Sequence, residues 1–194
     1  MARRRTAILI SGRGTNMAAL IAAARNPSYP AEIALVISNI PSAKGLEIAE
    51  AAGIKTIAIP HKDYSDKSKF EERILQALNE AKIELICLAG FMRVLSASFI
   101  SHFEGQILNI HPSLLPAYRG LDTHKRALAD GVKEHGCTVH LVVPELDAGP
   151  IIAQAKVPVI EGDTEETLSA RVLAAENRLY PEALATVAQT LAPL

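Results

Sequence analysis

Residues 6–21, TAILISGRGTNMAALI, decide the fold because a strand, a tight glycine turn and a helix follow one another within this stretch. Apolar residues occupy both faces of residues 6–12, which is typical of a strand buried in a parallel sheet. Gly12 and Gly14 permit the backbone angles of a tight turn, and the helix expected over 15–26 follows directly. A strand that leads straight into a helix predicts the first unit of an α/β domain.

The same alternation of strand and helix signals continues as far as residue 111. The strand-like runs are rich in Ile, Leu and Val, and the segments between them have helical spacing. Helical connections between parallel strands are expected to be right-handed. The sequence therefore predicts an α/β fold, a Rossmann-like open and mostly parallel sheet with helices on both faces. The expected strands are 6–12, 32–39, 55–60, 84–90 and 106–111, and the expected helices are 15–26, 42–52, 67–81 and 96–102.

The pattern of elements changes after residue 120. A helix near 122–131 is followed by two strand-like runs, 137–145 and 151–160. A Gly-Pro turn separates the two runs, and two strands joined in this way read as an antiparallel pair. We therefore expect an antiparallel C-terminal hairpin at the edge of the sheet.

The last element expected is a long helix. It should begin at Asp163, which has capping-box spacing to Glu166, and run to about residue 191 with a bend at Pro181. No repeat, low-complexity segment or linker interrupts the chain. We therefore expect one domain over residues 1–194, with an N-terminal half of about 1–100 and a C-terminal half of about 101–194.

Composition narrows the class of protein. The chain is 49% hydrophobic and 21% charged, so it can bury a core, and its formal net charge of −1 argues against a nucleic-acid partner. No apolar run is long enough to span a membrane, and the N-terminus lacks the pattern of a signal peptide. Cys87 and Cys137 lie in apolar runs without metal-ligand spacing, which indicates reduced thiols, no metal site and a cytoplasmic protein. Arg3, Arg4 and Arg5 are expected to form a solvated, charged terminus.

The glycine turn suggests a phosphate site. Ligands of such sheets bind beyond the carboxyl ends of the strands, and a helix N-terminus offers free N–H groups to an anion. Met17 stands where a dinucleotide-binding turn has its third glycine, and Ser38 and Asn39 end the second strand without the acid that would bind a nucleotide ribose. The turn therefore favours a small phosphate monoester, while a plain turn with Thr15 as the helix N-cap stays open as the alternative.

Asn109 and His111 form the second candidate site. Alternate residues of a strand point to the same side, so both side chains project together before Pro112 ends the strand. Asp147, in the turn PELDAGP, is a possible third member, although a turn-forming aspartate explains it equally well. Ser113 lacks the surroundings of a nucleophilic serine. The set fits attack by a substrate's own nucleophile on a carbonyl, with protein groups that stabilise the oxyanion.

Five motifs, in order across nearly the whole chain, carry a resemblance to a known family. They are ISGRGTN (10–16), AGFMRVLS (89–96), ILNIHPSLLPAYRG (107–120), ELDAGPII (145–152) and AAENRLYP (174–181). The chain resembles the phosphoribosylglycinamide formyltransferases, the folate-dependent enzymes of purine synthesis. The resemblance implies transfer of a formyl group from the co-substrate 10-formyltetrahydrofolate to the amine of glycinamide ribonucleotide. The reaction requires no metal, and we expect a monomer or homodimer.

The resemblance assigns roles to individual residues of this chain, with the ribonucleotide phosphate in the N-terminal half and the folate and the reaction mainly in the C-terminal half. The catalytic residues that it implies are Asn109, His111 and Asp147. The ribonucleotide-binding residues are Gly14, Thr15, Asn16, Pro112 and Glu176, and the folate-binding residues are Lys67, Met92, Arg93, Val94, Leu95, Asn109, Val143, Pro144, Glu145, Leu146 and Asp147.

Glu176 also stands out without the resemblance. It lies on an apolar stripe of the last helix with Leu168, Val172 and Leu179, where a carboxylate is costly unless it has a partner. Ribose hydroxyls would be suitable partners, and a salt bridge to a buried arginine is the alternative.

Two positions depart from the family pattern. Lys67 stands where some relatives have an arginine that contacts the folate, and Gln106 where some have a basic residue near the substrate. A lysine keeps the charge but loses the bidentate geometry of arginine. These departures affect the contacts to the folate tail or to the phosphate, and not the reaction.

Rival functions share parts of the pattern. Formyltetrahydrofolate hydrolase and a formyltransferase with another amine acceptor, such as methionyl-tRNA formyltransferase, keep the chemistry, but they usually carry an additional domain. A non-enzymatic folate- or nucleotide-binding module would leave Asn109, His111 and Asp147 without a use.

In the loop that follows His111, Pro116 follows Leu115 in a tight turn, where a cis peptide bond is worth checking.

Overall fold

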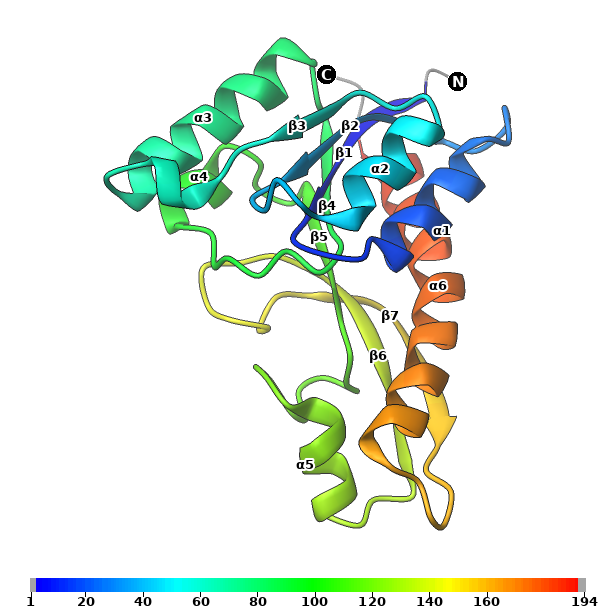
Figure 1. The fold of residues 1–194 in the computed structure, drawn as a ribbon. Helices are drawn as coiled ribbons and strands as arrows, with labels where there is room; N and C mark the ends of the chain where they lie inside the picture. The colour runs from blue at the N-terminus through cyan, green and yellow to red at the C-terminus, as the bar shows by residue number, and fades with distance from the viewer. Residues whose placement is uncertain (1–2, 192–194) are drawn as a thin grey trace.

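Within residues 3–191, which the computed structural model describes, seven strands form one sheet in the order β3-β2-β1-β4-β5-β6-β7 (Figure 1). The first five strands are parallel, β6 is antiparallel to β5, and β7 is antiparallel to β6. The predicted Rossmann-like, mostly parallel sheet with an antiparallel C-terminal hairpin is therefore confirmed. The strands are β1 (Arg4–Ile10), β2 (Ala31–Ser38), β3 (Thr56–Ala58), β4 (Leu85–Leu88), β5 (Ile107–His111), β6 (Glu134–Leu141) and β7 (Ile151–Pro158).

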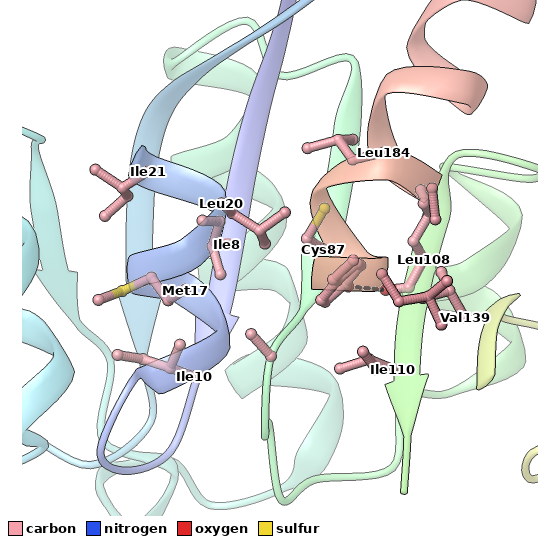
Figure 2. Close-up of a cluster of buried hydrophobic side chains, with 14 of the residues drawn as sticks. Ile8, Ile10, Met17, Leu20, Ile21, Cys87, Leu108, Ile110, Val139 and Leu184 are labelled. Carbon is pink, nitrogen blue, oxygen red and sulfur yellow. Dashed lines mark hydrogen bonds between the residues drawn. The ribbon is translucent and has the colours of Figure 1, made fainter. Parts of the chain in front are cut away.

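Helices cover both faces of the sheet because the central strands are apolar on both sides. On β1, Ile8 and Ile10 pack into one core with α1, α2 and α6 (Figure 2), whereas Ala7 and Leu9 pack into a second core with α3 and α4. The helices are α1 (Thr15–Ala24), α2 (Lys44–Ala51), α3 (Lys67–Glu80), α4 (Ala97–Ser101), α5 (Thr123–Ala129) and α6 (Glu165–Thr190), with a short 3-10 helix at His61–Asp63.

Helix α6 is anchored in the first core by Tyr180. The ring is fully buried, and its hydroxyl lies 3.0 Å from the carbonyl oxygen of Leu88 and 3.1 Å from that of Leu108. These contacts join α6 to β4 and β5 at mid-sheet. The long final helix was predicted, and it contains Pro181. The anchored helix directs its N-terminal half, with Glu176, toward the carboxyl ends of the strands.

Two local expectations about the C-terminal region were wrong. The hairpin strands are joined by the whole segment 142–150, and not by a Gly-Pro turn alone. The capping box of α6 lies one residue later than expected, at Thr164 and Thr167, because Asp163 instead pairs with Arg171 at 2.7 Å. The Leu115-Pro116 peptide bond is cis.

The basic N-terminal residues are not a free, fully solvated terminus, although the Arg5 side chain is 43% exposed. Arg3 Nε lies 3.0 Å from the carbonyl oxygen of Tyr29, and the guanidinium groups of Arg4 and Arg5 pair with Glu84 at 2.7 Å and Glu32 at 2.6 Å. That expectation failed because the acceptors come from neighbouring strands and loops that lie far away in the sequence.

The two cysteines are buried and carry no disulfide. Burial raises the pKa of the Cys87 thiol and of the Cys137 thiol to about 12. The expected buried, reduced thiols are confirmed. Among the described helices, none is long and apolar enough to cross a membrane.

Candidate functional site

A cavity of about 760 Å³ opens beyond the carboxyl ends of the central strands. It is the edge at which open α/β sheets bind their ligands. Five segments, the N-terminal half of α6, Ile100 and His140 line it, and they include every predicted site residue except Lys67. The segments are the glycine turn 12–16, residues 88–95, the end of β5 with residues 109–112, residues 120–124, and the β6–β7 connection 142–147.

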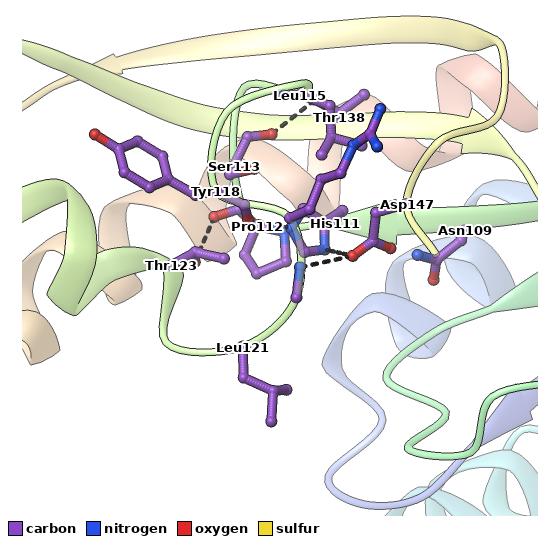
Figure 3. Close-up of polar contacts among 12 residues, drawn as sticks. Asn109, His111, Pro112, Ser113, Leu115, Tyr118, Leu121, Thr123, Thr138 and Asp147 are labelled. Atoms are coloured by element: carbon purple, nitrogen blue, oxygen red, sulfur yellow. Dashed lines mark hydrogen bonds and ion pairs between the residues drawn. The ribbon is translucent and has the colours of Figure 1, made fainter. Parts of the chain in front are cut away.

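Asn109 and His111 lie at the end of β5, on the same side of the strand. Leu108 and Ile110 face the first core, so the alternation of the strand turns Asn109 and His111 the other way. His111 is buried, and its Nε2 donates to the carbonyl oxygen of Tyr118 at 2.9 Å. Its second nitrogen, Nδ1, lies 3.5 Å from Asp147 Oδ2 (Figure 3). Both ring nitrogens therefore face oxygen atoms that accept hydrogen bonds.

Asp147 joins two loops over the cavity. Its backbone is left-handed, with φ of 49°, and its side chain is 8% exposed. The Gly120 N–H donates to Asp147 Oδ2 at 2.9 Å, so the carboxylate holds the loop after β5 against the β6–β7 connection. The carboxylate thus has contacts outside its own turn, which a purely turn-forming aspartate would not need.

His140 is a site residue that the sequence analysis missed. It stands opposite Asn109 in the register of β5 and β6, and its Nε2 lies 3.2 Å from Asn109 Nδ2 and 3.8 Å from Asp147 Oδ1. Burial lowers the pKa of His140 below its ordinary value, against the opposing effects of the Leu141 carbonyl and Asp147. Only the pairing of two strands places His140 here, and one strand read alone does not show its partner.

The glycine turn is built around a close approach of two helices. Gly14 has φ of 75° and is the N-cap of α1 without a side-chain cap, so the alternative in which Thr15 caps the helix is wrong. A Cβ on Gly14 would lie 2.8 Å from the Cα of Gly45, at the start of α2, and the Gly45 N–H donates to the Gly12 carbonyl at 3.0 Å. Gly45 was also missed, because this contact spans two separate β–α units.

Glu176 meets Asn16 across the cavity floor. Asn16 Nδ2 donates to Glu176 Oε2 at 2.8 Å, so the alternative of a salt bridge to a buried arginine is wrong. Burial raises the pKa of the Glu176 carboxyl, and the Asn16 hydrogen bond opposes that shift. Asn16 Oδ1 is buried and has no hydrogen-bond partner among the described residues. The pair lines the cavity and leaves one buried polar oxygen without a partner among the described residues.

The remaining predicted residues occupy the cavity walls and mouth. Met92 and Val94 are 64% and 60% exposed, and Leu146 is 55% exposed, so apolar surface surrounds the opening. Leu95 is buried under the same loop, and the Pro112 carbonyl accepts a hydrogen bond from the Thr123 hydroxyl at 2.7 Å.

Lys67 lies apart from these residues. It lines a neighbouring cavity of about 180 Å³ with His61, Tyr64, Asp66, Phe70 and Arg93. Arg93 lines both cavities, so basic side chains lie along the path between them. The role of Lys67 in folate binding stays a prediction.

The described residues contain no cluster of three or more His, Cys, Asp or Glu side chains placed to hold a metal ion. The cavity brings together the Asn109 amide, the imidazoles of His111 and His140, and the Asp147 carboxylate. Amide and imidazole N–H groups stabilise an oxyanion, and a carboxylate beside an imidazole transfers protons.

Comparison with known proteins places this geometry in a family. A formyl transferase family profile matches residues 4–184. The phosphoribosylglycinamide formyltransferase of Escherichia coli is 44% identical over 174 residues, which cover 90% of this chain and 82% of that protein. The crystal structure of phosphoribosylglycinamide formyltransferase from Brucella melitensis is 56% identical and covers 98% of both chains, with a TM-score of 0.94.

Larger relatives contain a matching region. The human trifunctional purine biosynthetic protein adenosine-3 is 50% identical over 186 residues, and the chicken protein of the same name is 53% identical over 184 residues. These regions cover 96% and 95% of this chain, but only 18% of each trifunctional relative. The chain therefore spans less than a fifth of the length of these relatives.

Proposed function

The chain belongs to the formyl transferase family, and we propose that it transfers the formyl group of 10-formyltetrahydrofolate to the amine of glycinamide ribonucleotide. The products are formylglycinamide ribonucleotide and tetrahydrofolate, in the purine pathway that leads to IMP. The observation that carries the proposal is the meeting of Asn109, His111 and Asp147 in one cavity, between a glycine turn and an apolar mouth. The names of the similar proteins from Escherichia coli and Brucella melitensis support the same activity.

The glycine turn and Glu176 would bind the ribonucleotide. The free N–H groups at the start of α1, beside Gly14, Thr15 and Asn16, suit a phosphate. Ribose hydroxyls would donate to the Glu176 carboxylate, which Asn16 holds at 2.8 Å. This arrangement would place the substrate amine near the end of β5.

The loops 92–95 and 143–147 would bind the folate. A pteridine ring would cover the exposed Met92, Val94 and Leu146, which removes apolar surface from water. Lys67 and Arg93 would attract the acidic glutamate tail from the neighbouring cavity.

The reaction would proceed by direct attack. The neutral amine forms a bond to the formyl carbon, the carbonyl oxygen becomes an oxyanion, and the bond from this carbon to folate N10 then breaks. Asn109 donates to the oxyanion, and His111 does so if its hydrogen bond to the Tyr118 carbonyl is exchanged for the substrate. Asp147 relays the proton lost by the amine, through water, to N10.

No covalent enzyme intermediate is needed in this scheme. Ser113, the hydroxyl nearest in sequence, is fully buried and donates to the carbonyl oxygen of Ala117 at 2.6 Å. Ser113 therefore has no access to the cavity. The proposed scheme also needs no metal ion.

The cellular setting is a further part of the proposal. Buried, unpaired thiols fit a reducing compartment, and we expect the protein in the cytoplasm. A monomer or homodimer stays a prediction, which light scattering of the purified protein would check.

A spectrophotometric assay tests the proposed activity. Purified protein is mixed with 10-formyl-5,8-dideazafolate, with and without glycinamide ribonucleotide. We expect loss of the formyl group from the folate only when the ribonucleotide is present. Turnover that ignores the ribonucleotide would instead indicate a hydrolase, and no turnover under either condition would indicate a binding module.

The variant Glu176→Gln should show whether Glu176 serves ribonucleotide binding or the stability of the fold. Loss of the charge weakens hydrogen bonds from ribose hydroxyls, so KM for the ribonucleotide should rise by about tenfold while kcat changes little. Burial raises the pKa of Glu176, so ionising this carboxyl costs stability as the pH rises above its ordinary value. The Tm of the variant at pH 8 should therefore equal or exceed that of the wild type. A lower Tm with an unchanged KM would show that Glu176 is a structural residue only.

The variant Gly45→Val should disturb the phosphate turn from outside the cavity. Even a single Cβ at this position would collide with the end of the Ile10 side chain and lie 3.1 Å from the Gly12 carbonyl oxygen and 3.2 Å from the Gly14 Cα, so Ile10 or the turn must shift. We expect KM for the ribonucleotide to rise by at least about tenfold, with a smaller change in KM for the folate. Glu47→Ala, on the exposed side of the same helix, is the matched control and should leave both values unchanged. Equal changes in both KM values would contradict the assignment of the turn to the phosphate.

A further inference from the structure

We propose that His140 is a positioning residue, which holds the Asn109 carboxamide so that an N–H, and not its oxygen, faces the reacting carbonyl. This inference rests on the proposed function and extends it to a residue outside the three implied by the family resemblance. It assigns to His140 an effect on the rate of the chemical step through Asn109, and no contact of its own with the reacting atoms.

The surroundings of His140 fix its tautomer. The ring is 2% exposed, and its Nδ1 lies 2.9 Å from the carbonyl oxygen of Leu141. A carbonyl oxygen only accepts hydrogen bonds, so Nδ1 must carry the hydrogen. Burial also favours the neutral ring over the charged one, as the lowered pKa of His140 shows. In the neutral ring, Nε2 is then a bare acceptor.

The second step is the orientation of the Asn109 amide. Asn109 Nδ2 lies 3.2 Å from His140 Nε2 and can donate to it. If the amide were turned over, its oxygen would face the lone pair of Nε2, and two acceptors would meet without a hydrogen between them. The tautomer of His140 therefore selects one of the two amide orientations.

The third step connects this orientation to the reaction. One N–H of Asn109 is used by His140, and the other is left for the cavity that both residues line. A donor stabilises the charge that grows on the formyl oxygen in the transition state, whereas an acceptor in its place repels that charge. The two orientations should therefore differ in rate far more than in substrate affinity.

The position of Asp147 sharpens the assignment. Its Oδ1 lies 3.8 Å from His140 Nε2, which is longer than a hydrogen bond, while its Oδ2 faces His111 and the Gly120 N–H. Asp147 is therefore engaged with His111 and the loop, and Asn109 is left as the partner of His140 Nε2. Two neighbouring imidazoles thus have different partners.

The test compares two replacements of His140. His140→Leu removes the acceptor, and His140→Gln offers a carbonyl oxygen at a similar reach without an ionisable ring. We expect kcat of His140→Leu to fall by at least about tenfold with both KM values within about threefold of wild type. His140→Gln should recover most of the lost kcat. An unchanged kcat in His140→Leu, or a kcat in His140→Gln as low as in His140→Leu, would overturn the proposal.

A double-mutant cycle separates positioning from general damage to the site. Once Asn109 is alanine, no amide remains to be oriented, so adding His140→Leu to Asn109→Ala should not lower kcat further. An additional loss of tenfold would show that His140 acts independently of Asn109 and would contradict the proposal.

An NMR measurement of the His140 tautomer tests this inference independently of the proposed activity. In wild-type protein with ¹⁵N-labelled histidine, the resonances of His140 at pH 7 should be those of a neutral ring protonated at Nδ1. This result is expected even if the protein transfers no formyl group, in which case the proposed function fails and the hydrogen-bond arrangement stands. A ring protonated at Nε2 would overturn the inference even in an active enzyme.

Discussion

Replacement of Asp147 by asparagine is expected to lower kcat by about 1,000-fold. Asp147 Oδ2 lies 3.5 Å from His111 Nδ1, and its position over the end of β5 allows it to accept the proton that the amine must lose. The asparagine has nearly the same shape and can still accept from the Gly120 N–H, but it can neither take up a proton nor balance a positive charge on His111.

Steady-state kinetics with both substrates would measure this effect. KM for each substrate should change by less than about threefold, because Asp147 is assigned to the reaction more than to binding. Glu134→Gln is the matched control, since it removes an exposed carboxylate from β6 outside the cavity, and its kcat should equal that of wild type. A kcat of Asp147→Asn within tenfold of wild type would remove Asp147 from the mechanism.

The variant Asn109→Ala is expected to lower kcat by about 100- to 1,000-fold. It deletes the carboxamide that donates to the oxyanion, and it leaves the Nε2 lone pair of His140 without its partner. The side chain is half-buried at the end of β5, and its removal leaves the two cores of the sheet intact. The loss should therefore appear in turnover, while the Tm changes only slightly.

Single-turnover kinetics at saturating concentrations of both substrates would isolate this chemical step. Asn79→Ala, at the exposed end of α3, is the matched control and should react as fast as wild type. A rate of Asn109→Ala equal to that of the control would exclude Asn109 as the oxyanion donor.

The fold and half of the central site could be predicted because they depend on short-range patterns. Apolar strands alternating with helices predicted the sheet, and the period of two along β5 predicted that Asn109 and His111 share a side. Asp147 was singled out from its turn alone, and the structure shows the contacts to His111 and Gly120 that a turn aspartate does not need.

The features that were missed depend on pairs of segments that lie far apart in the sequence. His140 meets Asn109 only through the register of β5 and β6, which are separated by the long segment 112–133. Gly45 is a site residue only because α2 begins against the glycine turn. The partners of the N-terminal arginines likewise come from distant parts of the sequence, so charge alone did not show that these side chains are paired.

Direct transfer of a formyl group from a folate to an amine is the reaction proposed for this protein. The reaction mixture contains 10-formyl-5,8-dideazafolate with a ¹³C-labelled formyl carbon, an equal amount of glycinamide ribonucleotide and a catalytic amount of the protein. Mass spectrometry then identifies the product that carries the label. We expect the label in formylglycinamide ribonucleotide, in a one-to-one ratio with the folate consumed. Label released as formate, or folate consumed without the ribonucleotide, would contradict it.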